Sequence, residues 1–468
     1  MPNLVALAVL LFTTLPASAA DALTAGFASV DITPALGDKP VYMAGFGPNR
    51  LAARVHDPLV ARAVVLGDGK QVIALVSVDL VGLFLPSVEN VRAKLSDFSY
   101  VLVSSTHNHE GPDTLGLWGR SPFTSGVDAN YMKRVEAACV EAVTNARKQM
   151  RTVTAAIGSV RAPELVTDNR LPVVKHDELV ALQFTDPAAG KPAGVIVQWN
   201  CHPETLGSRN TDLSADFVGY TVKHVEDHFL CPAVYLTGTV GGLMTSLGVV
   251  VNDDNGVALK DGTHEKTARF GTKVGEAAVR ALATPTPLTL TPFTVRTKAV
   301  LVPIDNDLYK LGWQFGVLAR PLYAYAGDPA TPTFTPTRDI TKPAALKTEV
   351  GYLKLGDLDI AAIPGEIYPE LVLGRVPDPA EPGADFPDAP IEPAIYPCLT
   401  AKHKMLVGLA NDELGYFVPK RQWDVKPPFC YGRKQAQYGE VNSVSPDAAG
   451  IICTTFRALV KPAAVAPK

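Results

Sequence analysis

The sequence lacks several features that mark common protein classes. It has no CxxC pair, which argues against a zinc ribbon or a thioredoxin-type redox motif. It has no cluster of Lys and Arg, and a net charge of -4 disfavours nucleic-acid binding. After the N-terminal segment, no apolar run reaches the roughly 18 residues that a membrane-spanning helix needs. These absences indicate a globular chain that neither spans a membrane nor binds nucleic acid.

Cysteine is also scarce, and a chain of 468 residues can bury enough surface to fold without disulfides. In an exported protein the six cysteines could still form up to three bridges. The last three lie near one another in the sequence, so a bridge among them is the favoured pairing. The six are Cys139, Cys201, Cys231, Cys398, Cys430 and Cys453.

The N-terminus has the pattern of a secretory signal peptide. Leu4–Phe12 is an unbroken apolar run, and Ala17–Ala19 offers a small-x-small cleavage site. The alternative is a buried first strand or helix. No cysteine follows the run directly, which argues against a lipoprotein anchor. We therefore predict a signal peptide over residues 1–19 and a secreted or periplasmic mature protein.

Short runs rich in Val and Ile alternate with helical patterns along the chain. This alternation predicts an α/β (α+β) fold, with a mixed β-sheet core flanked by helices in a single large domain over residues 20–460. A flexible tail is expected at residues 461–468. The expected strands are 63–66, 72–78, 100–103, 181–184, 194–199, 233–236 and 358–363, and the expected helices are 87–95, 128–148, 217–229 and 265–283. The proline-rich segments 327–347 and 376–397 are predicted to be surface loops, since proline interrupts regular structure.

The stretch "SSTHNHEGPDT", residues 104–114, follows one of the expected strands. On an extended chain, His107 and His109 would point to the same side. That arrangement suits two ligands of one metal ion, or one ligand beside a hydrogen-bonding base. An ordinary polar turn fits the pair as well.

Two further strand ends carry groups that could bind a metal. His202 follows the strand "VIVQW", although a core histidine bonded to the backbone has the same pattern. Glu366 follows the strand "LDIAAI" in "PGE", where a helix dipole would also favour a carboxylate. Between them, Asp212 and Asp216 flank Ser214 at the start of a helix, as capping residues do.

Eight segments form an ordered set along residues 28–446. They are "ASVDITPALGDKPVYMAGFGP", "RVHDPLVARAVVL", "SSTHNHEGPD", "DNRLPVVKHDELVALQF", "NTDLSADFVGY", "IPGEIYPEL", "GLANDELGYFVPKRQWD" and "QYGEVNSVSP". In this order they resemble sequence blocks of the neutral (alkaline, non-lysosomal) ceramidases. The resemblance covers that family's catalytic domain, and its C-terminal immunoglobulin-like domain is expected to be absent.

The resemblance implies a mononuclear Zn²⁺ site. Its ligands would be His107, His202, Glu366 and a phenolate-type Tyr416. His109 would handle protons beside the metal. Two imidazoles and a carboxylate with an open position are typical of a catalytic zinc rather than a structural one.

The resemblance also implies catalytic partners around the metal. Arg170 and Tyr438 match positions that support substrate and oxyanion, although Tyr416 and Tyr438 would otherwise be ordinary half-buried aromatics. Thr239 falls where the family has a serine near the zinc, so it would be the nucleophile or would only hydrogen-bond near a metal-bound water that attacks instead. An ordinary threonine at a strand end has the same pattern. Glu110 replaces a serine of the histidine motif, and it would be either a general base or a solvated loop residue.

We therefore expect an exported zinc-dependent hydrolase that cleaves an N-acyl amide bond, with a sphingolipid as a candidate substrate. A small-molecule or lipid substrate and peripheral membrane contact are expected with it. Two alternatives remain open at this stage. One is a catalytically degenerate relative that binds a lipid or a glycan, and the other is a metal-dependent hydrolase of a different substrate, such as an ester.

Overall fold

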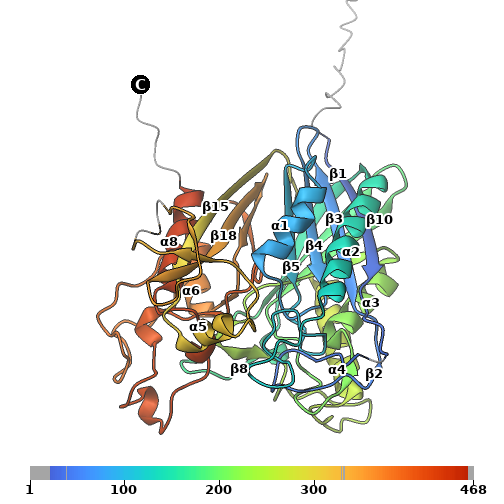
Figure 1. The fold of residues 1–468 in the computed structure, drawn as a ribbon. Helices are drawn as coiled ribbons and strands as arrows, with labels where there is room; N and C mark the ends of the chain where they lie inside the picture. The colour runs from blue at the N-terminus through green and yellow to red at the C-terminus, as the bar shows by residue number, and fades with distance from the viewer. Residues whose placement is uncertain (1–21, 38, 328, 330–331, 462–468) are drawn as a thin grey trace, which may run out of the picture.

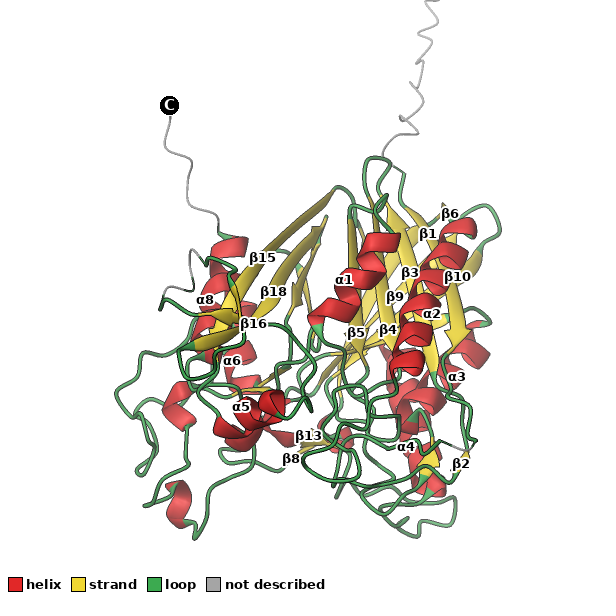
Figure 2. Ribbon diagram, viewed as in Figure 1, coloured by secondary structure: helices red, strands yellow, loops and turns green. Residues whose placement is uncertain are grey.

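The computed structural model describes residues 22–37, 39–327, 329 and 332–461. The predicted signal peptide and nearly all of the expected C-terminal tail lie outside these residues. Within them the chain forms a mixed α/β domain with three main sheets, shown in Figures 1 and 2. Among the described helices, none combines the length and apolarity that crossing a bilayer requires.

The first sheet comes from the N-terminal third of the chain. In spatial order it contains β5 (Tyr100–Ser105), β4 (Val72–Val78), β3 (Val60–Gly67), β1 (Thr24–Asp31) and β6 (Arg151–Thr152). Strands β4 and β5 are parallel, and the crossover between them contains α1 (Leu85–Lys94). Helix α2 (Ala129–Lys148) packs against β1 and β3. The carboxylate of Asp128 accepts hydrogen bonds from two backbone N–H groups at its start, which fixes where α2 begins.

The second sheet follows in sequence. It contains β12 (Ala233–Thr237), β10 (Lys191–Trp199), β9 (Glu178–Asp186), β7 (Thr154–Arg161) and β14 (Thr286–Leu288). Strands β10 and β12 are parallel, and α3 (Asp216–Phe229) lies between them in sequence. Helix α4 (His264–Ala281) packs beside α3, and the two helices cover one face of this sheet.

The third sheet belongs to the C-terminal part of the chain. It contains β17 (Pro336–Thr337), β16 (Leu322–Ala324), β18 (Ala344–Leu355), β19 (Leu358–Ala362) and β21 (His403–Val407), with β15 (Phe293–Pro303) also paired to β18. Helix α8 (Ala448–Val460) packs against β15 and β18. Strands β19 and β21 are parallel.

Shorter elements lie outside the three main sheets. They are the pairs β2 (Arg54–Val55) with β11 (Asp212–Leu213), β8 (Thr167–Asp168) with β13 (Met244–Thr245) and β20 (Glu366–Ile367) with β22 (Tyr416–Phe417), and the helices α5 (Asp307–Gln314), α6 (Pro369–Leu373) and α7 (Ile395–Cys398).

The three sheets share one apolar interior. Leu75 on β4, Ile196 on β10 and Ile360 on β19 belong to the same buried cluster. The opposite face of each sheet packs against its own helices in a separate cluster. Strands with both faces buried need apolar residues at consecutive positions, which explains why the sequence shows continuous Val- and Ile-rich runs.

The expected strands and helices are all present, with ends shifted by at most a few residues. Both loop predictions are partly wrong, because β17 and the start of β18 lie inside the proline-rich segment 327–347 and most of α7 lies inside segment 376–397. Strand β17 lies at the sheet edge, where proline is tolerated since one side of the strand needs no hydrogen-bond donor. The favoured disulfide is also wrong: all six cysteines are free and buried. They lie within apolar packing, which can hold this large core without covalent bridges.

Candidate metal centre and cavity

Four side chains that follow strands of the three sheets lie close together. His107 follows β5 and His202 follows β10. Glu366 begins β20, the next strand after β19, and Tyr416 begins β22, which a loop separates from β21. Each preceding strand has a parallel neighbour, so carboxyl ends of strands gather on one side of the fold, as in open α/β sheets that carry a site.

The four predicted ligands converge within hydrogen-bonding distance. One oxygen of Glu366, Oε2, lies 2.9 Å from His202 Nε2 and 3.2 Å from His107 Nε2. The Tyr416 hydroxyl lies 3.4 Å from the same His202 nitrogen. All four residues are 5% exposed or less. Neighbouring ligands of a tetrahedral zinc lie about 3.3 Å apart when its bonds are roughly 2.0–2.2 Å long, so this spacing fits an ion.

Backbone carbonyls set the orientation of both imidazoles. His107 Nδ1 lies 2.7 Å from the Val81 carbonyl oxygen, and His202 Nδ1 lies 2.8 Å from that of Met244. A carbonyl only accepts hydrogen bonds, so each Nδ1 carries a proton and each Nε2 faces the Glu366 carboxylate. Positive charge is needed between these groups, either as protons on the imidazoles or as a metal ion. The donor set therefore fits a metal cation.

Electrostatics at Glu366 agree with this requirement. Burial alone would raise the pKa of this carboxyl, but His107 and His202 lower it below its ordinary value. Glu366 is therefore ionised at neutral pH, deep in the protein. A buried carboxylate that faces two imidazole nitrogens is a strong cation ligand.

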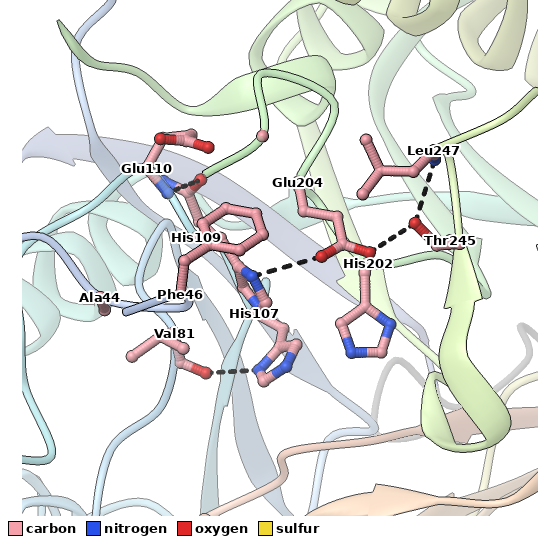
Figure 3. A network of polar contacts seen from close by, with 12 residues as sticks. Ala44, Phe46, Val81, His107, His109, Glu110, His202, Glu204, Thr245 and Leu247 are labelled. Carbon is pink, nitrogen blue, oxygen red and sulfur yellow. Dashed lines mark hydrogen bonds and ion pairs between the residues drawn. The ribbon is translucent and has the colours of Figure 1, made fainter. Parts of the chain in front are cut away.

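His109 lies beside this group, although the backbone conformation that places it there differs from the one we predicted. The backbone at His107 has φ +68°, in the left-handed region, so the H-x-H segment is a turn and not the extended chain that we predicted. The rings of His107 and His109 still meet, with centroids 4.9 Å apart (Figure 3). Burial, with smaller contributions from His107 and His202, lowers the pKa of His109 well below its ordinary value, which keeps the ring neutral.

Glu204 is a neighbour of His109 that the sequence analysis missed. Its Oε2 lies 3.5 Å from His109 Nδ1, and its other oxygen accepts a hydrogen bond from the Thr245 hydroxyl (Figure 3). The available signal was local, since Glu204 comes two residues after His202 in "HPE". The carboxylate lies beside the His109 ring, and His109 Nδ1 has no hydrogen-bond partner among the described residues.

Glu110 points away from the histidines, as Figure 3 shows. It is fully buried, so the interpretation as a solvated loop residue is wrong. Its carboxylate accepts hydrogen bonds from Arg50 at 2.9 Å and from Asn210 at 2.8 Å. Arg50 also donates to the carbonyl of His109. Glu110 thus holds Arg50, and Arg50 holds the backbone of the histidine turn.

The histidines open into a cavity of about 470 Å³. His107, His109, Glu366 and Tyr416 form its buried end. The walls are mostly apolar and include Phe46, Phe84, Leu115, Trp118, Leu308 and Phe315. Leu308 and Phe315 are more than half exposed, so this wall extends to the mouth of the cavity. The volume lies within the usual range for small-molecule sites.

Comparison with known proteins supports the fold. No family model matches the chain, and no curated protein matches its sequence. A solved neutral ceramidase from Pseudomonas aeruginosa superposes with a TM-score of 0.71 at 16% identity, covering 96% of this chain and 77% of that one. A structure titled as ceramidase complexed with C2 gives a TM-score of 0.68 at 15% identity, with the same coverage. The fold is ceramidase-like.

Within this ceramidase-like fold, Arg170 lies outside the cavity lining. Its guanidinium donates to both oxygens of Glu440 at 2.7 and 2.9 Å, to the Tyr438 carbonyl at 2.8 Å and to the Gln422 carbonyl at 3.0 Å. These bonds occupy both terminal nitrogens. Arg170 therefore holds the backbone of Tyr438, and it is Tyr438 whose side chain lines the cavity. The Tyr438 ring lies 5.8 Å from that of Tyr416, measured between centroids.

Thr239 is also separate from the four converging residues. It is fully buried, and its hydroxyl lies 2.9 Å from His176 Nδ1. Its backbone N–H donates to Asn200 Oδ1 at 2.8 Å. Neither Thr239 nor His176 lines the cavity that contains His107. The structure thus places this threonine in a polar cluster of its own.

Proposed function

We propose that this protein is a zinc-dependent hydrolase that cleaves the amide bond of an N-acyl lipid, in the manner of a ceramidase. The observation that carries the proposal is the convergence of His107, His202, Glu366 and Tyr416, of which all but His202 line the buried end of an apolar cavity. The ceramidase-like fold supports the reaction class. The apolar walls support a substrate with an aliphatic chain, because burying each CH₂ group contributes about 0.8 kcal/mol.

Zinc held by these ligands would polarise the scissile carbonyl and make a water molecule more acidic. The chain itself would supply the remaining functions. His109 lines the cavity as a neutral imidazole and is placed to accept and return a proton. Asn442 donates a hydrogen bond to the Tyr438 hydroxyl, which leaves the phenol proton free to stabilise an oxyanion in the cavity.

Metal analysis and hydrolysis of a long-chain N-acyl amide test the proposal together. We expect about one zinc per chain after purification, in line with a single site of this kind. A chelator should remove both the zinc and the hydrolysis, and added Zn²⁺ should restore both. Hydrolysis that persists at full rate in a zinc-free preparation would contradict the proposal.

A non-catalytic relative that binds lipid is the second candidate. It is favoured by the position of Thr239, whose hydroxyl bonds to His176 rather than facing the cavity. This candidate keeps the cavity and loses only the hydroxyl nucleophile. A hydrolase with this site would instead use water as its nucleophile.

The variant Thr239→Val tests whether the Thr239 hydroxyl takes part in the reaction or only stabilises the fold. Valine keeps the shape but removes the hydroxyl, so we expect kcat/KM to fall by less than about tenfold, whereas removal of a group that acts in the chemistry costs about 10²–10⁴-fold. Stability should fall by about 1–3 kcal/mol, because the buried His176 nitrogen loses its partner. Steady-state kinetics and thermal unfolding measure the two effects. A folded variant with a hundredfold or greater loss of kcat/KM would make Thr239 part of the reaction.

A further inference from the structure

Exposed apolar side chains surround the mouth of the cavity. Single exposed apolar residues are normal on protein surfaces, but here seven large ones line one cavity, with exposed fractions from 38% to 63%. They come from three separate segments of the chain and are called the rim: Leu117, Phe123, Leu308, Leu311, Phe315, Tyr438 and Val441. A concentration of exposed apolar surface of this kind marks a place where another apolar surface binds.

Helix α5 has two apolar faces, and only one of them packs against the protein. The rings of Tyr309 and Trp313 contact the C-terminal core, and their polar atoms donate to backbone carbonyls at 3.0 and 2.9 Å. Leu308, Leu311 and, directly after the helix, Phe315 follow one another at helical spacing on the opposite face, where they are exposed. The helix is therefore fixed through one face while its leucine face is presented to the outside.

The rim is continuous and its helix is electrically neutral. The ring of Phe123 meets that of Phe315 with centroids 5.1 Å apart, so the segment before α2 and the end of α5 form one apolar edge. Asp307 and Lys310 are the only charged residues of α5, and their charged atoms lie 3.1 Å apart. A partner of this surface is therefore bound by burial of apolar area and not by attraction between charges.

We propose that the rim docks the protein onto the surface of a lipid bilayer, with the mouth of the cavity facing the lipid. The choice of a bilayer rests on the proposed hydrolysis of an N-acyl lipid, whose aliphatic chain leaves water for a bilayer. The cavity leads from the rim to His107 and Glu366, so a lipid at the rim reaches these residues without crossing water. A protein partner or a second copy of this chain on the rim would instead close the entrance. Leucine and phenylalanine side chains insert at the boundary between head groups and acyl chains, as in interfacial helices.

Flotation with vesicles of pure phosphatidylcholine tests the docking without any reaction. We expect the wild-type protein to float with the vesicles. The double variant Leu308→Ser/Phe315→Ser should bind about 10- to 100-fold more weakly, because it removes apolar surface that the lipid would bury. Wild-type binding should be nearly the same at low and high salt, since salt screens only the interactions between charges.

The double variant Val250→Ser/Val257→Ser is the matched control. These valines are 75% and 61% exposed, and neither lines the cavity. The control should bind the vesicles as the wild-type protein does, and circular dichroism should show that both double variants keep their secondary structure. No flotation of the wild-type protein, equal binding by the Leu308→Ser/Phe315→Ser variant, or wild-type binding that disappears at high salt would overturn the inference.

The vesicles contain no amide to hydrolyse, which separates this inference from the reaction itself. If the protein binds vesicles through the rim yet hydrolyses no N-acyl amide, the docking stands while the proposed hydrolysis fails. If it hydrolyses a short, water-soluble N-acyl amide but does not bind vesicles, the docking fails while the proposed hydrolysis stands. If the wild-type protein does not bind vesicles and is a dimer that Leu308→Ser/Phe315→Ser converts to a monomer in light scattering, the rim joins two copies of this chain and the lipid docking fails.

Discussion

Replacing His202 by alanine is expected to remove stoichiometric zinc and to lower kcat/KM by more than about 1000-fold. Loss of an outer partner of a metal ligand already costs about 10–100-fold in affinity or activity, and His202 is a ligand in our proposal. Its Nε2 contacts both Glu366 and Tyr416. The truncation therefore removes an atom that joins two other members of the centre. Metal analysis and amide hydrolysis measure the result.

His176→Ala is the control for this variant. His176 is also a buried histidine, 3% exposed, but it bonds to Thr239 and does not line the cavity. We expect the control to lose stability and keep its zinc. Circular dichroism should show that both variants retain their secondary structure. A folded His202→Ala protein with full zinc content would rule out His202 as a ligand.

Replacing Arg170 by methionine is expected to destabilise the protein by about 3–5 kcal/mol, because it leaves the buried Glu440 carboxylate without its partner. Both residues are 3% exposed or less, and two charge-assisted hydrogen bonds join them. Burial raises the pKa of Glu440, and the guanidinium that counteracts this is lost in the variant. The loss of stability in Arg170→Met should thus become smaller as the pH falls, since protonation of Glu440 removes the buried charge. Denaturant unfolding at several pH values measures it.

The double variant Arg170→Met/Glu440→Leu shows whether the effect comes from unpaired charge. Replacing both members of a buried ion pair by apolar residues is often close to neutral, so we expect most of the stability to return. A double variant as unstable as Arg170→Met would mean that the bonds to the Tyr438 and Gln422 carbonyls carry the effect. If Arg170→Met has normal stability and has lost only activity, then Arg170 contacts the substrate directly, as the sequence analysis expected.

Much of the fold could be predicted from the sequence, because its signals are local. A strand buried on both faces needs an apolar run, as in 72–78, and a helix that covers a sheet needs an apolar stripe, as in 129–148. The positions of His107, His202 and Glu366 directly after such runs are equally local. That these residues share one site was implied only by the resemblance to the neutral ceramidases, because the three strands lie in three different sheets.

The contacts of Glu110, Thr239 and Arg170 could not be predicted in this way. Each side chain finds its partner far along the chain: Glu110 meets Arg50, Thr239 meets His176, and Arg170 meets Glu440. The same holds for residues that sequence analysis did not select. Glu204, for example, is defined by its place beside His109.

The sequence by itself thus determined the strands, the helices and the positions of His107, His202 and Glu366 directly after strands, because neighbouring residues set local conformation and burial. Only the tertiary structure decided which polar side chains face the cavity and which are bound elsewhere. Packing three sheets around one interior brings segments more than 200 residues apart into contact, as with the 268-residue separation of Arg170 and the Tyr438 carbonyl. No local pattern specifies such a pair.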